Sequence, residues 1–169
     1  MKRASRSVVW LLWIAGGLFT MLSIPIHGQR PDPFVGNWVM NRNASSFSPG
    51  PAPERRTMRI DATPDGIRTV IQTFRSFSEA QNGGGVQQVE YVAKIDGGDY
   101  PIAGSALDTV SLKQVQPNEI QRVGKIRRSQ EPVETCTMTL SKNGKVLTMK
   151  TSGEIDGTEY KSVQVFDRQ

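Results

Sequence analysis

Apolar and polar residues alternate along most of the chain after residue 32, with the period of two that β-strands produce. The alternation is cleanest over residues 86–95. One face of that segment carries the apolar side chains Val89, Tyr91, Ala93 and Ile95. Because no segment in this part of the chain has a convincing helical period, the pattern predicts about nine or ten short strands and little helix.

The strand segments are separated by residues that favour turns. The individually predicted strands are 34–40, 57–62, 66–77, 86–95, 107–115, 118–126, 133–141, 145–151 and 158–168. Residues 41–56 are polar and rich in proline, which predicts a loop with at most one helical turn near Asn43. Residues 99–108 are predicted to be a connection, and the pattern does not assign the two faces of 66–77. Many short strands joined by turns indicate a barrel or a sandwich.

The N-terminal segment has a different pattern. Lys2, Arg3 and Arg6 precede an apolar run over 8–24, and Gly28 offers a small residue before a cut at Gln29. This arrangement predicts a signal peptide over 1–28 and a single domain over 29–169, which places the protein outside the cell or in the periplasm. The alternative is an uncleaved anchor that meets the membrane through residues 8–26, because Ile26 is a poor residue three positions before the cut.

Processing gives the first testable prediction. If the leader is removed, N-terminal sequencing of the exported protein should begin near Gln29. Recovery of the chain with Met1 intact in a membrane fraction would contradict cleavage and favour the anchor.

Loss of the leader also changes the charge balance. Three of the 21 basic residues lie in the leader, which leaves 18 against 16 acidic residues. A net charge this small is that of an ordinary soluble surface, so we expect no nucleic-acid partner. Separately, we expect the protein to be a monomer. The cluster of Lys125, Arg127 and Arg128 is either a solvated strand end or a contact for an anionic surface or ligand.

Few catalytic groups are available. The chain has one cysteine, Cys136, and its single histidine, His27, precedes the predicted cut. The mature chain therefore lacks a Ser-His-Asp triad, a Cys-His pair and an imidazole metal site. We expect no catalytic residues, no metal and no cofactor. An enzyme that uses carboxylates or tyrosine on a barrel scaffold is the remaining catalytic alternative.

Two motifs carry a resemblance to a known family. Phe34-Val35-Gly36-x-Trp38 and the terminal Val165-Phe166-Asp167-Arg168 resemble the two ends of the calycin barrel of lipocalins and fatty-acid-binding proteins. The resemblance implies a single antiparallel up-and-down β-barrel in which Gly36, Trp38 and Arg168 make the closure, with Arg168 over the tryptophan ring. Four segments carry a second resemblance: Asp32-Pro33-Phe34-Val35-Gly36-x-Trp38, Phe47-Ser48-Pro49-Gly50-Pro51, Asp99-Tyr100-Pro101 and Asp108-Thr109-Val110-Ser111-Leu112-Lys113. Through them the chain resembles uncharacterised secreted lipocalin-like proteins of soil bacteria over most of 32–169.

The chain departs from the fatty-acid-binding pattern in two places. The positions of that family's carboxylate-binding Arg-x-Tyr are Gln164 and Phe166, and the proline-rich 41–56 cannot form its helical lid. Arg122 would restore a positive charge if its face of the strand points inward. The alternative positions for Arg122 are the barrel rim and the outer surface.

The predicted inward faces are mostly apolar but contain some polar side chains. The candidate ligand-binding residues are Tyr91, Arg122, Tyr160, Gln164 and Phe166. A mostly apolar interior with a few convergent polar groups is typical of a small-molecule site. The sequence therefore predicts an exported, non-catalytic binding protein for a small apolar or amphipathic molecule. The alternative is a filled barrel that serves as a structural or protein-interaction module of the cell envelope.

Overall fold

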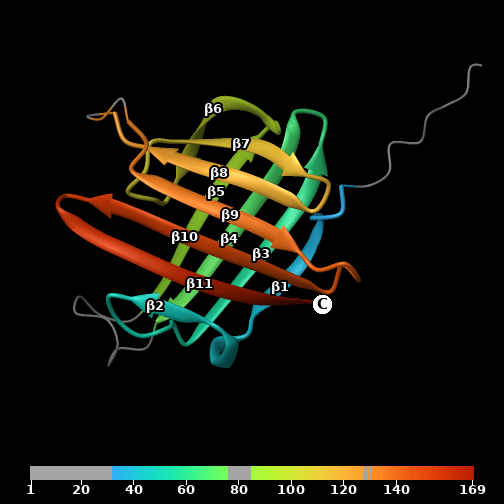
Figure 1. The fold of residues 1–169 in the computed structure, drawn as a ribbon, viewed down its shortest axis with the longest axis horizontal. Helices are drawn as coiled ribbons and strands as arrows, with labels where there is room; N and C mark the ends of the chain where they lie inside the picture. Colours follow the sequence, from blue (N-terminus) through green and yellow to red (C-terminus); the bar gives the residue numbers. More distant parts are fainter. Residues whose placement is uncertain (1–31, 76–84, 128, 130) are drawn as a thin grey trace, which may run out of the picture.

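The protein forms a closed antiparallel β-barrel of ten strands with one further strand at its edge (Figure 1). The computed structural model describes residues 32–75, 85–127, 129 and 131–169. The predicted signal peptide, the end of the predicted strand 66–77 and the turn before Gly85 lie outside the described residues. The predicted all-β barrel is confirmed. No helix of the described part is long and apolar enough to cross a membrane.

The strands follow one another around the barrel. They are β1 (Gly36–Met40), β2 (Ser46–Ser48), β3 (Arg55–Thr63), β4 (Gly66–Arg75), β5 (Gly85–Ala93), β6 (Asp96–Ala103), β7 (Thr109–Gln116), β8 (Glu119–Lys125), β9 (Glu134–Leu140), β10 (Val146–Ile155) and β11 (Thr158–Arg168). From β3 to β11 each strand pairs with the next, and β1 closes the barrel by pairing with both β3 and β11. The short β2 pairs with β11 alone among the described strands.

Two predictions about local structure are wrong. Residues 99–108 were expected to form a connection, but the strand β6 runs through Asp96–Ala103. Most of β6 is polar and exposed, and its pairing with β7 is interrupted between Asp96 and Asp99, so its alternation is too short to stand out. The segment 41–56 does hold the expected helical turn, at Arg42–Ala44, but it also contains β2 and the start of β3.

Trp38 and Arg168 meet where the barrel closes, as the family resemblance implies. The two residues are register partners on β1 and β11, and Trp38 is only 1% exposed. The guanidinium carbon of Arg168 lies 4.3 Å from the centre of the Trp38 ring. Nη1 of Arg168 donates a hydrogen bond to the carbonyl oxygen of Val35 at 2.8 Å, and Nε donates to that of Gly144 at 2.7 Å.

Gly36 is needed for this closure for two physical reasons. Its φ of +152° lies in a region that residues with a side chain rarely adopt. A Cβ atom at this position would also stand 2.9 Å from Nη1 of Arg168. The Gly-x-Trp motif therefore combines a ring that packs in the core with a gap that admits the covering arginine.

Apolar side chains from nearly every strand fill much of the interior. The fully buried ones include Phe34, Met58, Ile60, Leu112, Ile120, Met138, Leu147 and Phe166. On β4 the inward positions are Ile67, Thr69, Ile71 and Thr73, which assigns the faces that the pattern left open. Cys136 is buried as a free thiol, and burial raises its pKa, so it behaves as a small core residue.

Candidate functional site

The barrel interior becomes polar with distance from the Trp38 and Arg168 closure. Going back along β11 from Phe166, the next inward positions are Gln164, Ser162 and Tyr160. Strands on other parts of the wall add Arg56, Thr73, Tyr91, Arg122 and Glu134. These side chains form two hydrogen-bonded networks, and we call them together the polar layer.

The first network is built around a buried ion pair. Nη2 of Arg122, on β8, donates to Oε1 of Glu134, on β9, at 2.5 Å. The two side chains are only 9% and 11% exposed. The hydroxyl of Tyr160 donates to the other carboxylate oxygen, Oε2, at 2.9 Å. Tyr160 fits there because it packs over Gly153, where a Cβ atom would be 2.6 Å from the tyrosine oxygen.

The pKa values of this network follow from burial and from the carboxylate. Burial is the largest single influence on the pKa of Arg122 and lowers it, but Glu134, Cys136 and Tyr91 together outweigh burial and hold the pKa above its ordinary value. The pKa of Tyr160 is raised by burial and then by the negative charge of Glu134. Arg122 and Glu134 are therefore a neutralised pair, and Tyr160 keeps its proton as a donor.

The second network is built around Arg56, which points inward from the start of β3. Its Nε donates to Oγ1 of Thr73 at 2.9 Å, and its Nη1 donates to Oε1 of Gln164 at 2.6 Å. The amide nitrogen of Gln164 in turn donates to Oγ of Ser162 at 3.0 Å. The ring of Phe47, on β2, lies with its centre 5.6 Å from the guanidinium carbon. The three partners of Arg56, namely Thr73, Gln164 and the Phe47 ring, are all uncharged.

Three buried polar atoms of the described part have no hydrogen-bond partner. They are Oγ1 of Thr69, Nε of Arg122 and Oγ1 of Thr151. Cys136, on β9, is the register partner of Thr151 on β10 and of Arg122 on β8. Thr69, on β4, is the register partner of Tyr91 on β5. Buried polar atoms are almost always satisfied, so each of these atoms would take a hydrogen bond from or to a water molecule or a polar group of a ligand.

The structure brings together most of the candidate residues that the sequence predicts. Arg122 and Tyr160 join through Glu134, and Tyr91 lies close enough to Arg122 to raise its pKa. Gln164 belongs to the network of Arg56 instead. Phe166 is set apart in the apolar region, where it is the register partner of Met40 beside the closure.

Sequence reasoning missed Arg56 and Glu134, which hold the two networks together. Each lies two residues before the first buried apolar residue on its face of the strand, so it continues the period-two pattern by one position. Arg56 shares its face with Met58 and Ile60, and Glu134 shares its face with Cys136. The alternation could have placed both residues inside. A charge at the end of such a run is usually read as the point where the strand reaches solvent.

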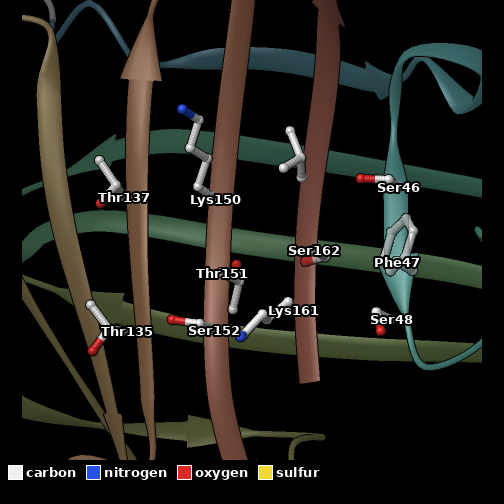
Figure 2. Close-up of a pocket in the computed structure, with 11 residues that line it drawn as sticks. Ser46, Phe47, Ser48, Thr135, Thr137, Lys150, Thr151, Ser152, Lys161 and Ser162 are labelled. Carbon is white, nitrogen blue, oxygen red and sulfur yellow. The ribbon is translucent and has the colours of Figure 1, made fainter. Parts of the chain in front are cut away.

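A groove on the outside of the barrel is the second candidate (Figure 2). It has a volume of about 460 Å³ and lies over the outer faces of β9, β10, β11 and β2. Its side chains form two cross-strand rows, Thr137–Lys150–Val163–Ser46 and Thr135–Ser152–Lys161–Ser48. The next pair along is Glu154 opposite Glu159, whose charges offset the two lysines. Because these residues are largely exposed and locally balanced in charge, the groove is a solvated face and the weaker candidate.

The comparisons with known proteins do not indicate a function, so the geometry of the barrel interior is the basis on which one is argued. No protein-family model matches the chain, and no curated protein matches it. Within the described ranges, no three side chains of His, Cys, Asp or Glu gather in a way that could hold a metal ion. The polar layer is therefore the place from which a function is best argued.

Proposed function

We propose that this protein is an exported, non-catalytic binding protein that holds a small apolar or amphipathic molecule inside its barrel. One observation carries the proposal: an apolar interior that ends in a polar layer, with three buried polar atoms that have no partner. A ligand with an apolar body and a polar head has the matching distribution of chemistry. Small-molecule sites commonly have this composition of many apolar and few polar groups.

The construction of the barrel supports the proposal. An eight-stranded barrel is just wide enough for its own side chains or one small ligand, and the diameter grows with the number of strands. This barrel has ten. Its core also contains four buried methionines, Met40, Met58, Met138 and Met149. Because methionine is unbranched and polarizable, it can repack around ligands of irregular shape.

The alternative function is a structural or protein-interaction module with a filled interior. It is favoured by the direct bonds within the polar layer, since Arg122, Glu134 and Tyr160 already satisfy much of one another's hydrogen-bonding capacity. The two functions differ in a simple way. A binding protein takes up an apolar probe saturably, and a filled module does not.

A titration with Nile red, an uncharged fluorescent apolar probe, tests the proposal. We expect saturable binding of one probe per chain, because the barrel has a single interior. Native mass spectrometry of protein purified from its own host should likewise show an added small-molecule mass.

The Lys150→Gln/Lys161→Gln double variant is the control for binding on the outer surface. It alters the exposed groove and leaves the interior intact, so its titration should match that of the wild type. If the folded wild-type protein shows no saturable uptake of apolar probes, the binding role is wrong and the interaction module replaces it.

A further inference from the structure

The barrel wall lacks strand pairing beside Arg56. On one edge, β3 pairs with β4 along its whole length. On its other edge, β3 pairs with β1 only as far as Thr57, so Arg55 and Arg56 extend beyond that ladder. The strand β2 follows β1 along the edge of β11, but among the described strands it pairs with β11 and not with β3. The barrel is therefore closed by hydrogen bonds at the Trp38 end and has an unpaired seam between β2 and β3 at the other.

Arg56 and Phe47 span this seam from the inside. Phe47 is the register partner of Ser162, which faces the interior, and its ring lies 5.6 Å from the guanidinium carbon of Arg56. Arg56 reaches across to Gln164 on β11. A molecule that enters between β2 and β3 would meet these two side chains first.

Arg56 has N–H groups that donate no hydrogen bond to the described residues. A guanidinium carries five N–H donors, and two of them are used in the bonds to Thr73 and Gln164. Three therefore have no acceptor among the described residues. No carboxylate of the described part lies within 4.0 Å of this guanidinium, in contrast to Arg122 and its partner Glu134.

The surrounding charges leave the polar layer positive. Its charged members are Arg56, Arg122 and Glu134, so one positive charge is uncompensated. Burial lowers the pKa of Arg56 to about 10. Repulsion by Arg75 and by Arg122 acts in the same direction, and attraction by Glu134 opposes it more weakly. That pKa still leaves the guanidinium charged at neutral pH. Arg56 is half-buried, and an anion beside its free N–H groups would offset the uncompensated positive charge through charge-assisted hydrogen bonds.

Resting on the proposed function, we infer that the ligand is an anionic amphiphile with a carboxylate head, and that Arg56 receives this head. Its apolar chain would then lie in the barrel. The fork of a guanidinium matches a carboxylate in a bidentate pair, which favours this head over an ammonium or a hydroxyl. Arg122, the residue that the sequence singles out for an anionic head, is already neutralised by Glu134.

Competition against bound Nile red tests the head group. The competitors are dodecanoate, dodecanol and dodecyltrimethylammonium, which share one chain and differ in charge, each used below its micelle-forming concentration. For the wild-type protein, dodecanoate should displace the probe at a concentration about tenfold lower than dodecanol, as expected for a charge-assisted hydrogen bond. The ammonium compound should be the weakest competitor.

Variants on β3 then assign the preference to one residue. Arg56→Met should abolish the advantage of dodecanoate over dodecanol, and Arg56→Lys should keep part of it. Arg59→Met is the matched control, because Arg59 lies on the same strand but points outward to Asp61, and it should keep the full preference. Circular dichroism and the thermal midpoint verify that each variant is folded.

The outcomes separate the two proposals. If Nile red binds but dodecanoate has no advantage over dodecanol, or if folded Arg56→Met keeps that advantage, Arg56 is not the head-group site and the proposed function stands. If folded Arg56→Lys and Arg59→Met lose the advantage equally, the preference is a general effect of surface charge and the inference is wrong. If Nile red itself does not bind, the proposed function fails and this inference fails with it.

Discussion

Replacing Trp38 with alanine should lower the free energy of unfolding by about 3–5 kcal/mol, the range for removing a fully buried large aromatic side chain. The ring is 1% exposed, and its indole nitrogen donates to the carbonyl oxygen of Phe34 at 3.1 Å. Its loss would leave a cavity at the barrel closure and remove the surface on which Arg168 rests. Urea denaturation of wild type and variant measures the difference.

Val163→Ala is the control for this experiment. Val163 lies on β11, the strand that pairs with β1 at the closure, but it points outward and is 36% exposed. Its replacement should change the stability by no more than about 0.5 kcal/mol. A Trp38→Ala variant that is as stable as the Val163→Ala variant would show that the ring does not hold the closure together.

Replacing Arg122 with methionine should have an effect of similar size, about 3–5 kcal/mol, for a different reason. Methionine roughly preserves the volume but leaves the Glu134 carboxylate buried with Tyr160 as its remaining side-chain donor. The dominant cost is then an uncompensated charge in the interior. Thermal or urea denaturation near neutral pH measures it.

A second substitution distinguishes this charge effect from lost packing. The double variant Arg122→Met/Glu134→Gln removes both charges, so it should be more stable than Arg122→Met alone even though it carries one more change. Arg59→Met, in an exposed pair with Asp61, should cost less than about 1 kcal/mol. If the double variant is less stable than the single one, the ion pair does not account for the loss.

The local alternation of apolar and polar residues was sufficient to predict most strands of the barrel, because most strands have one solvent-exposed face and one buried face. The period of two is visible wherever that contrast persists for several residues, as in β5, β9 and β10. It failed for β6, whose residues are mostly exposed on both faces. It also failed for β2, which is three residues long and exists because β11 offers an edge to pair with.

The candidate site was harder to predict than the fold. The pattern placed Tyr91 and Gln164 inside, but it could not say which polar groups would meet. Arg122 and Glu134 are 12 residues apart and adjacent through the β8–β9 ladder, whereas Arg56 and Gln164 are 108 residues apart and meet across the barrel closure. Which cation has a carboxylate partner therefore depends on strand register and closure.

The sequence by itself determined the class of fold, because alternation and turn chemistry act over a few residues and do not depend on distant contacts. Together with the family resemblance, it also determined the pairing of Trp38 with Arg168 at the two ends of the barrel. Only the tertiary structure decided that Arg122 is neutralised and that Arg56 is left without a counter-ion beside an unpaired seam. The reason is that electrostatic compensation depends on distances of a few ångströms between strands, and chain closure sets those distances.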